Sequence, residues 1–189
     1  MTYFADQVFS KIDFRETPFQ IGEYENCQFL HCDFHEVDIS NCKFIECVFE
    51  DSNLSLIKVK NTAFQDAVFT CCKMIGILFE TCNSFGLQVK FQECVLNNSS
   101  FYQLKIPKTN FTDCKLEDVD FTSCDLSQST FANCHLAGAK FESSNLEKVN
   151  FETAQDFIID PTANRIKQAI FSKDNLEGLL QFINIQIKP

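Results

Sequence analysis

Large apolar residues occupy every fifth position over most of this chain. Between residues 91 and 151 the spacing is unbroken, and Phe alternates with Leu or Ile. A helix would place apolar residues three and four apart, and a strand two apart, so neither template fits. A fixed short period over this length predicts a repeat architecture, in which each unit buries its apolar residue by stacking on its neighbours. The central residues of these repeats are Phe91, Leu96, Phe101, Ile106, Phe111, Leu116, Phe121, Leu126, Phe131, Leu136, Phe141, Leu146 and Phe151.

The N-terminal half carries the same period in a looser form, from Phe9 to Phe79. The next position, Ser84, is polar, and the following secure centre is Phe91, seven residues later instead of five. Two extra residues therefore lie within 84–90, where Gly86 offers the permissive backbone of a bulge or corner loop. Because the period resumes, we expect one continuous solenoid over residues 1–153 with a two-residue insert.

The five-residue units also have a consistent internal composition. Units 114–118 (CKLED) and 119–123 (VDFTS) place a small residue two positions before the central Leu or Phe and two polar residues after it. This pattern resembles the pentapeptide-repeat family over about residues 2–153. The resemblance implies a right-handed quadrilateral β-helix, an all-β solenoid with one pentapeptide per side, four per coil, and the small and central residues inside. If 84–90 counts as one side, one face stacks only Phe, from Phe9 to Phe151.

A different pattern follows the repeats. Leu176, Leu179, Leu180 and Ile183 are spaced as on one face of a helix, and Ser172 is a suitable N-cap. We therefore expect a short amphipathic helix over 173–182, then a strand-like alternation over 183–187, with 154–189 as a capping tail. The run from Asp160 to Ile187 also resembles the tail of the quinolone-resistance (Qnr) branch, where such a segment builds a dimer. The expected homodimer interface is Leu176, Leu179, Leu180, Phe182, Ile183, Ile185 and Ile187.

Ten of the eleven cysteines lie two positions before a repeat centre, and Cys71 alone does not. That position requires a small apolar side chain, and a free cysteine behaves as one. Coils about 4.8 Å apart would hold stacked cysteines slightly too far apart for a relaxed disulfide. We therefore predict buried, unpaired thiols, which fit a reducing cytoplasm. The sequence shows neither a secretory signal nor an apolar run near the ~20 residues that span a membrane.

Residues that could carry chemistry are few. His31, His35 and His135 flank repeat centres at outward positions, without a cysteine or histidine partner at ligand spacing. Glycine-rich phosphate loops and the G-x-S-x-G and H-E-x-x-H motifs are missing from the sequence. The expected interior, filled with Phe, leaves no room for a substrate. The sequence predicts a protein that is not an enzyme and that needs no cofactor or metal.

Surface charge is the remaining signal, with a net charge of −10. This charge disfavours direct binding of nucleic acid or anionic membranes. The densest acidic cluster is Asp113, Glu117, Asp118, Asp120 and Asp125, against Lys115 alone. The Qnr resemblance implies an acidic, DNA-like rod that binds DNA gyrase and topoisomerase IV and lowers fluoroquinolone action. The alternative is a repeat scaffold for an unrelated protein, and a continuous acidic ribbon would favour the first hypothesis.

Overall fold

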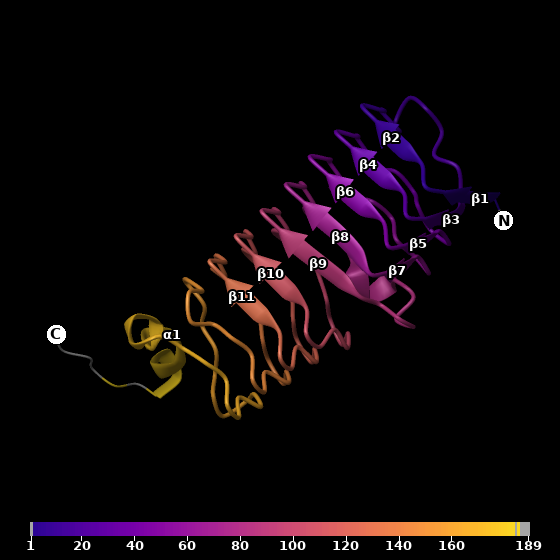
Figure 1. Cartoon of the computed structure of the whole chain (residues 1–189). Helices are drawn as coiled ribbons and strands as arrows, with labels where there is room; N and C mark the ends of the chain where they lie inside the picture. Colours follow the sequence, from indigo (N-terminus) through magenta and orange to yellow (C-terminus); the bar gives the residue numbers. More distant parts are fainter. Residues whose placement is uncertain (1, 184, 186–189) are drawn as a thin grey trace.

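The chain winds into an elongated, four-sided parallel β-solenoid of about seven turns with one short C-terminal helix (Figure 1). This computed structural model describes residues 2–183 and 185, without the side chain of residue 183. Residues facing each other on successive coils are twenty apart in sequence, as in the pairs Phe29–Phe49 and Phe111–Phe131. Each coil therefore contains four pentapeptides, and the predicted fold class is confirmed.

We number the four sides by one coil: side 1 is centred on Phe111, side 2 on Leu116, side 3 on Phe121 and side 4 on Leu126. Side 1 is a sheet as far as Ala132. It consists of β2 (Val8–Ser10), β4 (Gln28–Leu30), β6 (Val48–Glu50), β8 (Ala67–Thr70), β9 (Val89–Gln92), β10 (Asn110–Thr112) and β11 (Thr130–Ala132). Side 4 is extended only in the first four coils, through β1 (Thr2–Ala5), β3 (Gly22–Glu25), β5 (Lys43–Ile45) and β7 (Ala63–Gln65). The other walls are joined by single bridges, such as Ser100–Asp120.

The repeat centres fill the interior as columns of stacked side chains. On side 1 the rings of Phe29 and Phe49 stack with centroids 4.7 Å apart, and those of Phe131 and Phe151 with centroids 5.0 Å apart. Rings of different sides meet edge-on, which is the other favourable geometry for aromatic pairs. Ten cysteines line the same interior and are buried, whereas Cys71 is exposed; all eleven thiols are free. The predicted burial of the cysteines is confirmed.

The insert, residues 84–90, forms side 4 of the coil that follows the one containing β7. Phe69 and Phe91 face each other and stack with centroids 5.4 Å apart, so the seven-residue unit counts as one side, as predicted. The extra residues form a turn at Phe85 and Gly86, where Gly86 has a φ of +70°. Leu87 fills the interior position and is buried. The loop projects from the rod between β7 and β9 (Figure 1).

The stack continues beyond residue 153. Arg165 and Ile170 bridge to the preceding coil at Asn145 and Asn150, and Phe171 extends the side 1 column by stacking on Phe151 at 5.3 Å. The period is not apparent in the sequence here because the next two central positions are Asp156 and Pro161 instead of Phe or Leu.

A helical segment then covers the end of the rod. It consists of α1 (Glu177–Leu180) between two 3₁₀ turns, Lys173–Asn175 and Gln181–Ile183. A separate 3₁₀ turn, Phe79–Thr81, lies in the body of the rod. Ser172 precedes the helical segment with an extended backbone but makes no capping hydrogen bond. The Asn175 side-chain amide donates to the carbonyl oxygens of Phe151, at 2.9 Å, and Ala154, at 3.1 Å. The expected strand over 183–187 lies largely outside the described residues.

None of the helices in the described part of the chain is both long and apolar enough to cross a membrane.

Candidate functional site

The five predicted acidic residues belong to one coil, which we call the acidic coil (residues 113–125). Asp113 lies at the corner between sides 1 and 2, Glu117 on side 2, and Asp118 at the next corner. Asp120 is on side 3 and Asp125 on side 4, bridged to Lys140 and Asn145 of the following coil. Glu117, Asp118 and Asp120 thus lie together around one edge, whereas Asp125 is on another wall. The cluster extends over sides 2, 3 and 4 instead of forming one patch.

The local structure explains part of this acidity. Each corner residue has a left-handed backbone, with φ of +54° at Asp113 and +56° at Asp118. Among residues other than glycine, Asp and Asn adopt this conformation most readily. On the walls, the Asp120 and Asp125 carboxylates accept hydrogen bonds from the backbone amides of Thr122 and Ser127, at 2.8 and 3.0 Å. These carboxylates therefore shape the turns of the coil as well as charging its surface.

Neutral amide side chains of adjacent coils bind several of the same carboxylates. Asn133 donates to Asp113 at 2.9 Å, Asn97 to Glu117 at 3.0 Å, and Asn145 to Asp125 at 2.9 Å. An amide satisfies one carboxylate oxygen without neutralising the charge. The coil therefore keeps its negative charge in a fixed geometry. Sequence reasoning missed these ladders, although the spacing of twenty residues between each Asn and its carboxylate is visible in the sequence.

The charge along the rod is not continuous. Residues 1–55 contain 11 acidic and 3 basic residues, 56–108 contain 3 acidic and 6 basic, and 109–189 contain 12 acidic and 7 basic. The net charge therefore changes from −8 to +3 and then to −5. On side 3 the outward position before the centre is Asp38, then Lys58, then Leu78, before Asp120 restores the negative charge. An unbroken acidic ribbon does not run along this wall.

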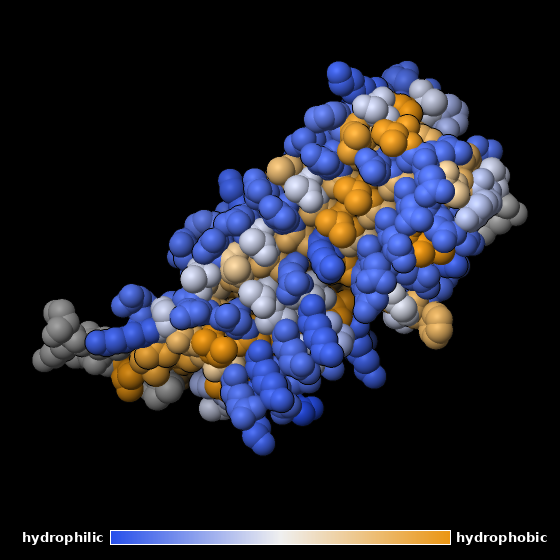
Figure 2. Space-filling model, in the orientation of Figure 1, coloured by the Kyte–Doolittle hydropathy of each residue, from blue (hydrophilic) through white to orange (hydrophobic). Residues whose placement is uncertain are grey.

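The C-terminal end carries the residues expected at the dimer interface. Leu176, Phe182 and Ile185 are exposed, whereas Leu179 and Leu180 are half-buried and Leu179 packs against the core. Ile187 and the side chain of Ile183 lie outside the described residues. In the view of Figure 2, apolar surface gathers at this end, beyond the hydrophilic side chains of the last coils.

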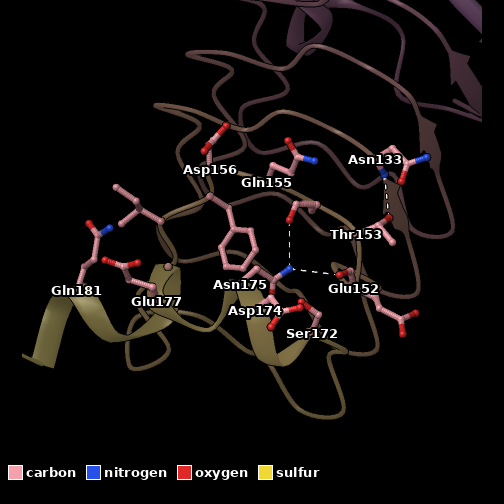
Figure 3. A pocket seen from close by; sticks show the side chains of 14 residues that line it. Asn133, Glu152, Thr153, Gln155, Asp156, Ser172, Asp174, Asn175, Glu177 and Gln181 are labelled. Carbon is pink, nitrogen blue, oxygen red and sulfur yellow. Dashed lines mark hydrogen bonds between the residues drawn. The ribbon is translucent and has the colours of Figure 1, made fainter. Parts of the chain in front are cut away.

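A hollow lies between the last coil and the helical segment (Figure 3). Carboxylates of Glu152, Asp156, Asp174 and Glu177 line it, and the Asn175 amide lies at its base, turned toward the carbonyl groups of the coil. The Asn175 side chain occupies the place that backbone amides of a further coil would take. This hollow is thus a feature of how the end of the rod is covered.

The three histidines each lie beside one carboxylate. His31 is 3.7 Å from Asp51, His35 is 3.6 Å from Glu36, and His135 is 3.6 Å from Asp156. Within residues 2–183 and 185, no group of three His, Cys, Asp or Glu side chains could hold a metal ion.

These features define a class: a four-sided parallel β-solenoid built from stacked five-residue units, with its charged residues on the outside. The family comparison agrees with it. The model for the pentapeptide repeat region matches residues 78–151, and the model for pentapeptide repeats in eight copies matches residues 25–56. The chain belongs to the pentapeptide-repeat family, and the resemblance seen in the sequence is confirmed.

Among solved structures, the chain is similar to two trypsin-treated variants of QnrB1, a plasmid-mediated fluoroquinolone resistance protein. Both have a TM-score of 0.66 and 13% identity; one alignment covers 99% of this chain and 100% of QnrB1, the other 96% and 99%. HetL, a pentapeptide-repeat protein involved in regulating heterocyst differentiation in the cyanobacterium Nostoc sp. strain PCC 7120, matches at 16% identity and a TM-score of 0.46, over 88% of this chain and 86% of HetL. The QnrB1 matches show a shared fold. No curated protein matches the sequence significantly.

Proposed function

We propose that this chain is a non-enzymatic rod that binds a basic protein surface through its acidic coil, and that the partner is a bacterial type II topoisomerase. The observation that carries the proposal is the cluster of carboxylates at residues 113–125, held in place by Asn side chains and turn amides. The interior is filled by stacked rings in each coil, so the outer surface is the part of the rod that meets a partner. The fold shared with QnrB1 supports the choice of partner.

Electrostatics give the proposed contact its physical basis. The DNA-binding region of gyrase or topoisomerase IV must be basic, because it binds a phosphate backbone. A rigid rod with exposed carboxylates is attracted to such a surface, and the attraction weakens as salt shortens the reach of the charges. Occupation of the enzyme by the rod in place of DNA would reduce the number of DNA complexes that a fluoroquinolone can trap.

The experiment is supercoiling by purified gyrase, with and without a fluoroquinolone, at increasing amounts of the protein. The test variant carries Asp113→Lys, Glu117→Lys and Asp118→Lys, all at exposed positions. The matched control reverses three exposed acidic residues of the early coils: Glu36→Lys, Glu46→Lys and Asp51→Lys. The wild type and the control variant should inhibit supercoiling by gyrase or protect the enzyme from the fluoroquinolone, and the test variant should do neither. Absence of any effect of the wild type at tens of micromolar would refute the partner.

We also propose a homodimer through the C-terminal end. Leu176, Phe182 and Ile185 expose more apolar surface than one covering segment needs, and a two-fold contact is the usual way to bury it. Leu176→Asp with Phe182→Asp should give a monomer in light scattering, whereas Val8→Asp with Ile21→Asp, exposed at the opposite end, should not change the mass. A wild-type monomer at micromolar concentration would contradict this proposal.

The second candidate function is a scaffold for an unrelated protein, and the interrupted charge along the rod favours it. A DNA-like ligand needs negative charge along its whole contact, whereas residues 56–108 carry a net positive charge. Cross-linking to gyrase distinguishes the two candidates: cross-links limited to lysines near residues 113–125 support the topoisomerase, and their absence supports the scaffold.

A further inference from the structure

The middle of the rod exposes apolar side chains at positions that are polar elsewhere. Leu56, Leu78 and Tyr102 are 47%, 52% and 41% exposed, and Phe85 at the tip of the insert is 83% exposed. Leu78 belongs to the run Met74 to Phe79, in which six apolar or glycine residues replace the usual alternation of inward and outward types. The interior needs only part of this run, so its outward members are not explained by packing of the core.

These side chains lie on neighbouring parts of the rod, with Leu56 at the corner between sides 2 and 3, Leu78 and Tyr102 on side 3, and Phe85 on side 4. The Leu56 side chain lies over Gly76, where a Cβ would come 2.7 Å from the Leu56 Cδ2 atom. A hollow beside Tyr102 brings this residue, Lys105 and the acidic Glu80 together with Ser84 of the insert. A second hollow, on the other flank of the insert, shares Ser84 and Lys105. The insert is therefore a ridge between two hollows at the edge of this apolar region.

Leucine is unfavourable at position 56 for two physical reasons. It is an exposed apolar residue, and it has a left-handed backbone with a φ of +59°, which Asn, Asp or Gly would adopt at lower cost. Corresponding corners elsewhere in the rod use Asn98 and Asp118. Packing over Gly76 accounts for part of the leucine side chain, and its exposed part is free to contact a partner.

Lysines surround the same region. Lys58 and Lys60 are on side 3, and Lys90, Lys105 and Lys108 line the hollow on the far flank of the insert, together with Asp66. Among the described residues, the lysine that forms an ion pair is Lys43, with Glu23, far from this region. The positive charge of the middle of the rod is therefore available to a ligand.

We propose that this region, the middle surface (Leu56, Leu78, Phe85 and Tyr102 with Lys58, Lys60, Lys105 and Lys108), binds an acidic protein segment that carries apolar side chains. Charge complementarity selects an acidic ligand, because the surface is positive on a rod that is otherwise negative. The exposed aromatic side chains select a peptide, since a few large anchors, many of them aromatic, contribute most of the energy at protein interfaces. This surface is distinct from the acidic coil and goes beyond the function proposed above.

The test uses short fluorescein-labelled peptides and fluorescence anisotropy with the full chain. The probe repeats Glu-Glu-Phe; the comparison peptides repeat Glu-Glu-Ser and Lys-Lys-Phe. We expect the first to bind at least about tenfold more tightly than either comparison peptide. Equal binding of the Glu-Glu-Ser peptide would overturn the role of the apolar side chains, and no binding of the Glu-Glu-Phe peptide at hundreds of micromolar would overturn the proposal.

Two matched variants locate the binding. Lys60→Gln, Lys105→Gln and Lys108→Gln should weaken binding about tenfold, whereas Lys115→Gln, Lys140→Gln and Lys148→Gln should leave it unchanged. The sets are comparable because all six side chains are exposed, and Lys108 and Lys148 both have left-handed backbones. Equal losses in both sets would show a general effect of charge and refute a site.

Leu56→Asn separates binding from folding. We expect it to raise Tm by about 2 °C or more, because asparagine suits the corner, and to weaken binding of the Glu-Glu-Phe peptide. Loss of stability together with binding would show a structural role and contradict the proposal. Tighter binding of a DNA duplex than of the peptide, or sedimentation showing self-association that the lysine variant abolishes, would identify a different occupant and also overturn it. Reversal of Asp113, Glu117 and Asp118 should leave peptide binding intact, which keeps this test independent of the topoisomerase proposal.

Discussion

The insert at residues 84–90 divides the rod into two parts that are built differently. Upstream, aromatic columns stand on adjacent sides: Phe44 of side 4 stacks on Phe64, and Phe49 of side 1 on Phe69. Both sides are extended there. Downstream, aromatic columns stand on opposite sides, as in Phe101–Phe121 and Phe111–Phe131, while side 4 is centred on Ile106 and Leu126 and is no longer a strand.

This difference shows that one repeat can close its coils in two ways. An extended side spans a different length from a side made by a turn. When side 4 changes from a strand to a turn, the cross-section of the solenoid therefore changes. The two extra residues lie on side 4, at the coil where its wall changes. Meanwhile the side 1 column passes the insert with its rings still stacked. The insert thus adjusts one wall while the remaining columns keep their register.

The largest expected effect comes from breaking a column shared by both parts. Phe111 is fully buried and stacks on Phe91 and Phe131. Phe111→Ala should lower the free energy of unfolding by about 3–5 kcal/mol, because the coil cannot collapse around the cavity. Chemical denaturation measures this, with Phe9→Ala, at the half-buried end of the same column, as the control. Equal losses at both positions would contradict the dependence on burial.

Removal of the turn at Phe85 and Gly86 tests whether side 4 requires the two extra residues where it changes from a strand to a turn. Deletion of Phe85 and Gly86 restores a five-residue unit but should lower the free energy of unfolding by about 2 kcal/mol or more, since side 4 must close with the wrong length. Gly86→Ala, at a φ of +70° and with its Cβ 3.1 Å from Gln65, should cost about 1 kcal/mol. Thermal denaturation measures both, and a fully stable deletion would refute this role of the insert.

Asn175 tests the C-terminal cover of the downstream part. Its amide donates to three backbone carbonyls of the last coil, so Asn175→Ala removes these hydrogen bonds. We expect a loss of about 1–2 kcal/mol in the free energy of unfolding, measured by chemical denaturation. Asn110→Ala, at an exposed strand position, is the control and should cost clearly less.

The smallest expected effect lies in the first coil of the upstream part. Arg15 donates hydrogen bonds to the Asp13 carboxylate and lowers its pKa to about 2. Because the folded pKa is the lower one, the stabilisation is present above the unfolded pKa and is lost as the pH falls toward 2. Arg15→Gln should raise the pKa of Asp13 toward its ordinary value in an NMR titration. Asp160, whose pKa is lowered by Thr162, should not shift.

Much of the fold is predictable from the sequence because the interior of a solenoid repeats. Each central residue meets its own equivalent on the next coil, so the period that buries Phe111 also positions Phe131. The same reasoning places the ten buried cysteines and the turn at Gly86. The last coil, centred on Ile166 and Phe171, is harder to recognise in the sequence because it follows a stretch in which apolar residues no longer mark each unit.

The candidate sites depended more on the structure. The sequence identified the acidic residues 113–125 as a cluster, and the coil distributes them over several walls. Stacking, which is not visible in a linear list of charges, brings Leu56 over Gly76 and places Ser84 of the insert beside Tyr102. By itself the sequence determined the period, the interior and the family, since these follow from local spacing. Only the tertiary structure decided which outward residues share a wall, because neighbours on that wall are twenty residues apart in the chain.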